Sequence, residues 1–311
     1  MKIVFMGTPG FAVPSLRKLA ARHEVVGVIT APDKPAGRGK KIQESAVKKA
    51  ASDLSTPVLQ PTNLKDPAFI DELSLLGADL FVVVAFRMLP TQVWSLPPKG
   101  TINLHGSLLP DYRGAAPINR AIMNGEKETG LTTFFINENI DTGAIIDNVR
   151  CPIGKDETAG ELHDRMMELG ADLLVETVDA IAEDKVESKP QPETIDLKSA
   201  PKIFKEDCKI YWNQSATVIH NHIRGLSPYP AAFSSVSGAD FERMKIFGSR
   251  LNGQKAALPP GEVETSKTKL FVHTHDFILE ITDIQVPGKK RMSVASFLNG
   301  YQLSESFKFI S

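Results

Sequence analysis

The chain has 311 residues, of which 42% are hydrophobic and 23% charged, and its formal net charge is −1. This composition excludes a disordered or collagen-like protein, and the length favours two domains. With no run near the roughly 18 apolar residues of a membrane span and no signal-peptide pattern, we expect a cytoplasmic protein without a membrane partner. It contains only two cysteines, Cys151 and Cys208, which argues against a disulfide framework or a cysteine zinc site.

The first half of the chain alternates strand-like and helix-like segments. Residues 2–6 and 25–29 read as strands around a helix-like segment, and the continuous apolar run 79–85 is typical of a strand buried on both faces. Further strands are expected at 101–104 and 131–136. Apolar residues recur every three to five positions over 158–184, which predicts a long amphipathic helix with a capping box at Thr158 and Glu161. We therefore predict a Rossmann-like α/β domain with a parallel sheet over residues 1–189.

The second half differs in composition. Residues 190–206 lack periodicity and contain three prolines, which predicts a semi-extended linker. Beyond it, short β-type runs at 231–236, 245–247, 270–273 and 277–284 are separated by glycine and proline, after a short helix near 215–224. We predict a small all-β, OB-like barrel domain over residues 207–311.

The densest chemical signal follows the strand at 101–104. Side chains alternate along a strand, so Asn103 and His105 face the same side and could both donate hydrogen bonds to one oxygen, as an oxyanion site requires. Asp141, in Asp-Thr-Gly after another predicted strand, supplies a carboxylate that could orient the imidazole and help to move a proton. The pattern indicates acyl transfer without a metal. A plainer alternative stays open, in which Asn103 and His105 are strand-end polar groups and Asp-Thr-Gly is an ordinary turn.

Residues 103–110 (Asn-Leu-His-Gly-Ser-Leu-Leu-Pro), together with Asp141-Thr142-Gly143, resemble the signature of the 10-formyltetrahydrofolate-dependent formyltransferases. The resemblance implies that Asn103, His105 and Asp141 are the catalytic residues, that 10-formyltetrahydrofolate is the co-substrate and that no metal takes part. It also implies the following folate-binding residues: Phe86, Arg87, Met88, Leu89, Ser107, Leu108, Leu109, Pro110 and Asp141. Residues 85–90 depart from the family pattern, being one residue shorter and carrying the bulky Arg87.

Several other segments bear on the amine that accepts the formyl group. Residues 6–12, 31–41 and 223–233, with Arg-Gly-Ala-Ala-Pro at 113–117, resemble the family members that act on initiator methionyl-tRNA. Members that formylate sugar nucleotides tend to read Arg-Gly-Arg-Ala-Pro and Asp-Ala-Gly, and they are the alternative. Two readings from other classes are a nucleic-acid-binding protein with an inactive α/β domain and a folate hydrolase that releases formate.

Basic residues gather where a tRNA would bind. Residues 31–49 hold six Lys and Arg against two Asp and Glu, and residues 190–311 hold 15 against 12. The resemblance implies that Arg38 enters the acceptor stem. We predict these tRNA-binding residues: Arg38, Lys40, Lys41, Lys202, Lys205, Lys209, Lys289, Lys290 and Arg291. Arg113 could make either a structural ion pair or a substrate contact, and we expect a monomer.

Overall fold

The computed structural model describes residues 1–36, 41–192 and 196–310, apart from the side chains of residues 35, 36, 41 and 42. It divides into two compact units. The N-terminal unit comprises Met1–Gly114, Thr129–Cys151 and His163–Ser199, and the C-terminal unit comprises Ala115–Glu128, Pro152–Leu162 and Ala200–Ser311. Each unit is described by itself below.

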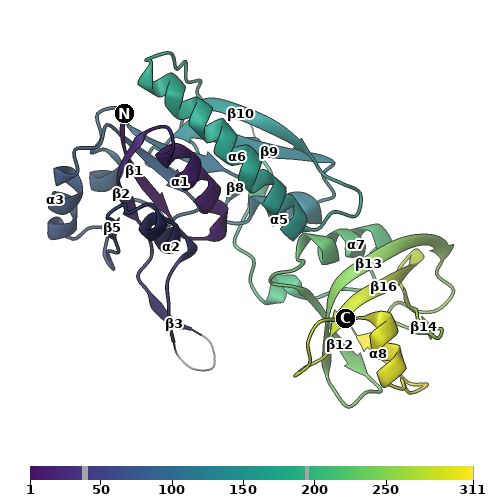
Figure 1. Cartoon of the computed structure of the whole chain (residues 1–311). Helices are drawn as coiled ribbons and strands as arrows, with labels where there is room; N and C mark the ends of the chain where they lie inside the picture. The colour runs from purple at the N-terminus through teal and green to yellow at the C-terminus, as the bar shows by residue number, and fades with distance from the viewer. Residues whose placement is uncertain (37–40, 193–195, 311) are drawn as a thin grey trace. The chain divides into compact units, whose positions relative to one another are not determined.

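The N-terminal unit is built on a seven-stranded sheet with the strand order β10-β9-β7-β6-β1-β2-β5 (Figure 1). Its strands are β1 (Lys2–Gly7), β2 (Glu24–Ile29), β5 (Val58–Leu59), β6 (Leu80–Val84), β7 (Thr101–His105), β9 (Glu128–Phe135) and β10 (Ile145–Pro152). The strands β5, β2, β1, β6 and β7 are parallel, whereas β9 runs antiparallel to β7. The predicted parallel-sheet α/β domain is confirmed.

Helices cover both faces of this sheet. On one face, Val4 and Met6 of β1 pack in a cluster with Phe69 of α3 and Val93 of α4. On the other face, Gly170 of α6 lies so close to the sheet that a Cβ there would come within 2.9 Å of the Leu104 and Leu131 methyl groups. The helices of this part are α1 (Val13–Ala20), α2 (Ala46–Asp53), α3 (Pro67–Leu75), α4 (Thr91–Trp94) and α6 (Ala159–Ala182), which begins in the C-terminal unit.

The register of the sheet decides where the functional loops emerge. Gly7 at the end of β1 pairs with Val84 at the end of β6, and Val84 pairs with Leu104 of β7. The segments that follow β1, β6 and β7 therefore leave the same edge of the sheet, which is where open α/β folds bind ligands.

The helix α6 begins as the sequence predicts. Glu161 accepts hydrogen bonds from the backbone N–H and the hydroxyl of Thr158, at 2.9 and 2.8 Å, and its own N–H donates to Thr158 Oγ1 at 3.3 Å. These reciprocal bonds form a capping box, and the two that the Glu161 carboxylate accepts from Thr158 lower its pKa. Of the described helices, none is long and apolar enough to cross a membrane.

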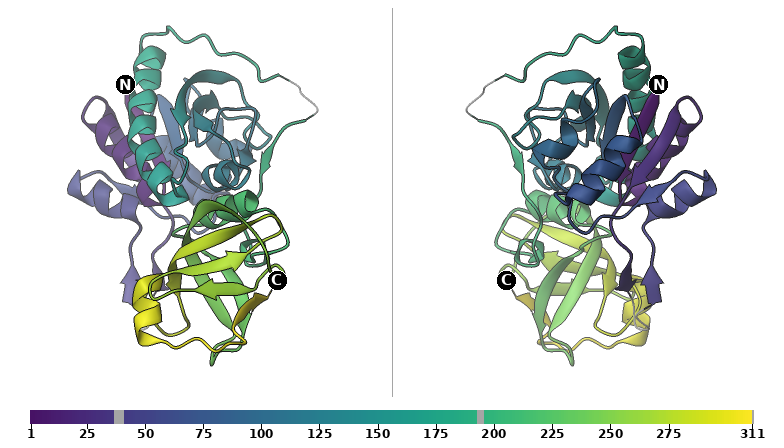
Figure 2. Two further views of the ribbon diagram at one scale, coloured as in Figure 1. Left: turned by 90° about the vertical axis from the view of Figure 1, so that its right-hand side faces the viewer. Right: turned by 90° about the vertical axis from the view of Figure 1, so that its left-hand side faces the viewer.

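The C-terminal unit contains an antiparallel sheet with the order β14-β15-β16-β13-β12-β18, with β17 paired to β16, and Figure 2 shows its green-to-yellow strands curving round the core. An isolated bridge between Glu262 and Lys308 joins the two outer strands, so the sheet nearly closes into the predicted barrel. Its strands are β12 (Ala232–Ser237), β13 (Arg243–Lys255), β14 (Val263–Thr265), β15 (Leu270–His273), β16 (Phe277–Gln285), β17 (Met292–Ser293) and β18 (Lys308–Ile310).

Trp212 is buried in the hydrophobic core of this unit. Its side chain is 0% exposed, its Nε1–H donates to Ser234 Oγ at 2.9 Å, and its ring centroid lies 5.1 Å from that of Phe309. The burial of so large an aromatic with its single polar atom paired favours a well-packed core. The helices here are α5 (Pro117–Met123), α7 (Ala216–Gly225) and α8 (Val294–Gly300).

The remaining elements are short. They are η1 (Gly10–Ala12), β3 (Lys34–Ala36), β4 (Lys41–Gln43), β8 (Arg113–Gly114), β11 (Ser199–Ala200) and η2 (Glu206–Cys208). The turn after β1 leads into η1 and then α1.

Two histidines of α7 should make the C-terminal unit sensitive to acid. Burial lowers the pKa of His220 and of His222, with Arg224 and Arg120 respectively adding to the effect, against the opposing pull of Asp156 and Asp207. Because the native state then binds a proton less readily than the unfolded chain, the unfolding free energy should fall as the pH drops below the ordinary histidine pKa of 6.5.

Thermal unfolding checks this expectation at pH values from about 7.5 to about 5.5. His220→Asn should lose less melting temperature over that range than the parent protein. His275→Gln, which changes an exposed histidine, should behave as the parent does. An equal loss in the parent and in His220→Asn would contradict the assignment.

Candidate functional site

His105 is held at the end of β7 with one ring nitrogen already bound. The residue is 6% exposed, and its Nε2 lies 2.9 Å from the backbone carbonyl oxygen of Tyr112. Because a carbonyl oxygen only accepts hydrogen bonds, Nε2 carries the hydrogen. Nδ1 is consequently the nitrogen left for chemistry, and it lies 3.7 Å from Oδ2 of Asp141.

The Asp141 carboxylate reaches this point because its loop folds back. β9 runs antiparallel to β7, so the end of β9 lies beside the start of β7: Phe135 pairs with Ile102, while His105 pairs with Thr132. The loop after β9 must therefore return by about three residues, or roughly 10 Å, to bring Asp141 to His105. Backbone N–H of Gly114 then donates to Asp141 Oδ2 at 2.9 Å and fixes the carboxylate.

The sequence of this loop explains its shape. Oδ1 of Asn137 accepts from the N–H of Asn139 at 3.1 Å and from the hydroxyl of Thr142 at 2.9 Å, forming a tight Asx-type turn. Asp141 itself has φ 54°, in the left-handed region that L-residues seldom adopt. Such strain persists only where surrounding bonds enforce it, and it clusters at functional sites.

Gly143 is required by its position. A Cβ at this residue would lie 1.6 Å from the carbonyl oxygen of Phe135, an overlap that only backbone movement could relieve. The glycine of Asp-Thr-Gly therefore lets the returning loop pass directly against the end of β9.

Asn103 shares a strand face with His105. It lies two residues earlier on β7, is half-buried, and pairs with Phe134 of β9. Residues two apart along a strand lie about 7 Å apart on one face. The structure thus brings His105 and Asp141 together and sets Asn103 on the same side of the strand as His105.

The segment after His105 is held by Thr132. The Thr132 hydroxyl donates to the carbonyl of Ser107 at 2.7 Å and accepts from the N–H of Leu109 at 3.1 Å, and the Ser107 hydroxyl donates to the carbonyl of Asp111 at 2.6 Å. Leu109 is buried and joined to Pro110 by a cis bond. Leu108 packs toward Gly130, where a Cβ would come within 2.4 Å of it.

The loop at residues 85–90 follows β6 at the neighbouring position of the same sheet edge. Its Arg87 guanidinium donates to the carbonyl oxygens of Thr62, at 3.0 Å, and of Pro61, and it lies 5.7 Å from the centre of the Phe86 ring. Leu89 is buried, whereas Met88 is 69% exposed. The bulky arginine is thus tied to a neighbouring loop, leaving an apolar side chain at the tip.

The predicted tRNA contacts have varied surroundings. Lys202 and Lys209 lie over the rings of Phe204 and Tyr211, at 5.6 and 5.4 Å, and Arg291 pairs with Asp283 at 3.2 Å. Lys205 is exposed beside η2, and Lys289 and Lys290 are exposed in the turn between β16 and β17. Arg38, Lys40 and the side chain of Lys41 lie outside the described residues.

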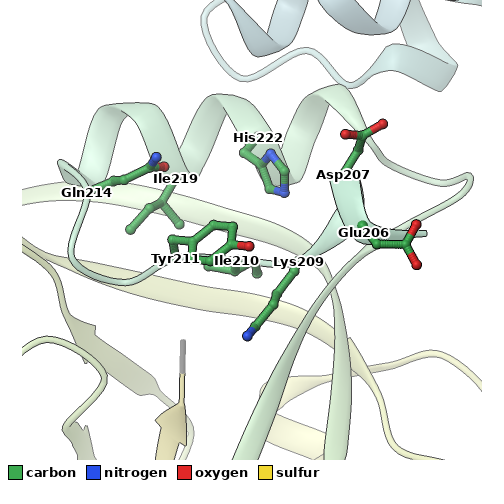
Figure 3. A pocket seen from close by; sticks show the side chains of 8 residues that line it. All are labelled: Glu206, Asp207, Lys209, Ile210, Tyr211, Gln214, Ile219 and His222. Carbon is green, nitrogen blue, oxygen red and sulfur yellow. The ribbon is translucent and has the colours of Figure 1, made fainter. Parts of the chain in front are cut away.

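Lys209 also lines a surface pocket of about 360 Å³ in the C-terminal unit (Figure 3). The lining residues are Glu206, Asp207, Lys209, Ile210, Tyr211, Gln214, Ile219 and His222. Two carboxylates thus share this pocket with a single ammonium group. Within the described residues, no cluster of three or more His, Cys, Asp or Glu side chains could hold a metal ion.

Comparison with known proteins assigns the chain to a family. A family model described as "Formyl transferase" matches residues 1–178, and a second, "Formyl transferase, C-terminal domain", matches residues 202–302. The chain belongs to the formyl transferase family. The Asn-Leu-His and Asp-Thr-Gly segments both lie within the first match.

Individual members of the family cover almost the whole chain. Methionyl-tRNA formyltransferase of Bacteroides fragilis is 51% identical over 315 residues, covering 99% of this chain and 97% of the relative. The same enzyme of Flavobacterium johnsoniae is 48% identical over 310 residues, covering 99% and 98%.

Solved structures with the same fold include other formyl transferases. A sugar 3N-formyl transferase crystallised with dTDP and 5-N-formyl-THF superimposes with a TM-score of 0.67 at 22% identity, covering 93% of this chain and 99% of that one. HypX of Aquifex aeolicus in complex with tetrahydrofolic acid gives 0.65 at 19% identity, covering 100% and 51%. At these identities the likeness concerns the fold alone.

Sequence reasoning missed several residues that shape this formyl transferase site. The carbonyl of Tyr112, the N–H of Gly114 and the hydroxyl of Thr132 act through single atoms that no motif spacing reveals. Gln191, in the predicted linker, also contacts the Asp141 loop through its side chain. Arg113, for which an ion pair and a substrate contact were both open, donates to this glutamine.

We expect Gly143→Ala to reduce turnover by about 10²-fold, because relief of the clash with Phe135 must move the Asp141 carboxylate. Steady-state formyl transfer and thermal unfolding measure the two consequences, a lower kcat and a lower melting temperature. Gly300→Ala is the matched control, since a Cβ at Gly300 meets nothing within 4 Å. Unchanged kcat in a folded Gly143→Ala protein would show that the loop does not need this close approach.

Proposed function

We propose that the chain transfers the formyl group of 10-formyltetrahydrofolate to the α-amino group of methionine on initiator methionyl-tRNA, acting in the cytoplasm as a monomer. The observation that carries the proposal is the placement of Nδ1 of His105 3.7 Å from Asp141, on the strand face shared by Asn103. Relatives at 47–51% identity that bear the name methionyl-tRNA formyltransferase support this choice of acceptor.

The chemistry is a direct acyl transfer. The free amine attacks the formyl carbon, and a tetrahedral intermediate forms with negative charge on the formyl oxygen. Asn103 donates a hydrogen bond to that oxygen, as does His105 through a protonated Nδ1. The bond from the formyl carbon to N10 of the folate then breaks, and the proton lost by the amine ends on N10.

Asp141 has two tasks in this scheme. At 3.7 Å from Nδ1 its carboxylate stabilises a positive charge on the His105 ring, and it accepts the amine proton on the way to N10. Both side chains are largely buried, at 7% and 14% exposure, so their electrostatic interaction is little screened by water. The bond from Nε2 to the Tyr112 carbonyl keeps the ring from turning.

The residues present fit a folate beside this trio. β6 and β7 are parallel neighbours, so the segments 86–89 and 107–110 leave the same sheet edge. Exposed Met88 offers a flexible apolar cover for a flat pterin ring, and half-buried Phe86 lies next to it. We assign the predicted folate contacts Phe86 to Leu89 and Ser107 to Pro110 to these two segments, and the predicted contact of Asp141 to the loop after β9.

The acceptor would bind through basic residues of both halves of the chain. We assign chemistry to residues 1–189 and tRNA binding chiefly to residues 207–311, joined by residues 190–206. Lys202, Lys205 and Lys209 follow one another along the chain, and Lys289, Lys290 and Arg291 form a second basic group. Lysine and arginine bind phosphate without reading sequence, which suits a tRNA backbone.

Asn103→Ala should lower kcat by about 10²–10³-fold through loss of one oxyanion donor. Steady-state formyl transfer by the folded variant measures this, and a near-normal kcat would contradict the role of Asn103.

The choice of acceptor is tested on the parent protein. The assay supplies 10-formyltetrahydrofolate with charged initiator tRNA, with an amino-sugar nucleotide, or with water alone. Formylation of the tRNA alone is expected. Preferential formylation of the sugar nucleotide would favour the alternative acceptor, and formate release into water would indicate a hydrolase.

Replacing Lys202, Lys205 and Lys209 together by alanine should weaken tRNA binding whatever the nucleotide sequence of the tRNA. If each lysine neutralises one phosphate, the slope of log affinity against log salt should become shallower by about 2–3. Binding measured across a salt series tests this. Lys185→Ala is the control, since that lysine pairs with Glu183 at 2.6 Å. An unchanged slope in the triple variant would place the phosphate contacts elsewhere.

A further inference from the structure

We propose that Gln191 is a positioning residue for formyl transfer, whose side-chain amide holds the Asp141 loop at the separation from His105 that the reaction needs. The inference rests on the proposed function for its kinetic consequences, but its structural content does not. Nothing in the sequence pattern distinguishes Gln191, which lies between two prolines in a stretch without periodicity.

The amide nitrogen of Gln191 binds both ends of the Asp-Thr-Gly turn. Nε2 donates to the carbonyl oxygen of Asp141 at 2.9 Å and to that of Gly143 at 2.8 Å. The NH₂ group of a glutamine has two donors, and both are used here. These bonds therefore restrain the backbone of the residue that carries the catalytic carboxylate.

The amide oxygen of Gln191 is fixed in turn by Arg113. Oε1 accepts from Nε of Arg113 at 3.1 Å and from Nη2 at 2.6 Å. A guanidinium only donates, so a flipped amide would set donors against donors. Arg113 consequently determines the orientation in which Gln191 presents its NH₂ group to the two carbonyls.

These contacts close a ring around the catalytic pair. Residues next to Arg113 hold both catalytic side chains, because the Tyr112 carbonyl accepts from His105 and the Gly114 N–H donates to Asp141. Gln191 links Arg113 back to the backbone at Asp141. We expect that displacing residues 112–114, the Asp141 loop or Gln191 would change the distance between His105 and Asp141.

The described chain around Gln191 is anchored at both ends. Lys189 exchanges two backbone hydrogen bonds with Ile145, both of 2.8 Å, just beyond the Asp141 loop. On the other side, the N–H of Lys198 donates to Asp111 at 3.0 Å, and the carbonyl of Lys198 accepts from the N–H of Tyr112. The predicted linker segment thus contacts the loops that carry both members of the pair, through the Gln191 side chain at Asp141 and through Lys198 at Asp111 and Tyr112.

The test compares Gln191→Met with Gln191→Glu. Methionine keeps the length of the side chain without its polar atoms, and glutamate keeps the contact with Arg113 but lacks the two donors. Both variants should lower kcat by about 10²-fold, with KM for folate and for tRNA within about threefold of the parent values, since the residue orients a catalytic group and binds neither substrate.

A double variant separates orientation from general packing. Because Arg113 acts through Gln191, Arg113→Met combined with Gln191→Met should be no slower than Gln191→Met alone. Gln254→Met, at an exposed glutamine of β13, should leave kcat and KM unchanged. A kcat of Gln191→Met within about threefold of the parent would overturn the proposal, as would fully multiplicative effects in the double variant.

A measurement independent of turnover protects the inference from a wrong choice of acceptor. The ¹⁵N resonances of the His105 ring should shift in Gln191→Met and stay in place in Gln254→Met. If the parent protein formylates no charged tRNA, the proposed function fails. The His105 resonances still test whether Gln191 holds the Asp141 loop in place. Unshifted His105 resonances in folded Gln191→Met would overturn the inference.

Discussion

The distance of 3.7 Å between the His105 ring and the Asp141 carboxylate is the constraint around which this edge of the N-terminal sheet is arranged. His105 ends β7, whereas Asp141 follows β9, which runs in the opposite direction, so the chain after β9 has to turn back along the sheet. Gly143 permits that return, the Asn137 and Thr142 bonds shape it, and the Gly114 N–H receives the carboxylate at the end of it. Each of these features loses its purpose if the pair is separated.

The division of labour between the two imidazole nitrogens follows from the same arrangement. A backbone carbonyl binds Nε2, and a carbonyl oxygen keeps its acceptor character at every pH. Of the two ring nitrogens, Nδ1 is therefore the one that faces the carboxylate, and both side chains are largely buried. In the reaction proposed above, the ring would be a rigid support for Nδ1, which suits a site that must place its donor before charge develops on the substrate.

Much of the fold could be predicted because its signals are local. The buried strand β6 is a continuous apolar run. The helix α6 is predicted by its apolar periodicity and by the capping box of Thr158 and Glu161 at its start. The strand β10 was not predicted, since Ile145–Pro152 mixes charged and apolar residues without alternation. β18 was also missed, because three residues carry too little pattern.

Of the candidate site, the sequence could predict the side chains that lie in recognisable motifs. Asn103 and His105 share a strand face by the alternation of β structure, and Asp141 stands out in Asp-Thr-Gly. The backbone groups at Tyr112 and Gly114 have no sequence signature, because every residue except proline carries the same N–H and C=O. Gln191 is a further case, since its role depends on where a chain segment 50 residues away comes to lie.

The bridge between Glu262 and Lys308 has a consequence beyond the shape of the barrel. Outer strands normally present a row of unpaired N–H and C=O groups, which can template pairing with another chain and so begin aggregation. Here the two outer strands are three residues long each and meet one another through that bridge, reinforced by an ion pair of 3.2 Å between the same residues. Few backbone N–H and C=O groups of these two strands are therefore left with which a strand of another molecule could pair.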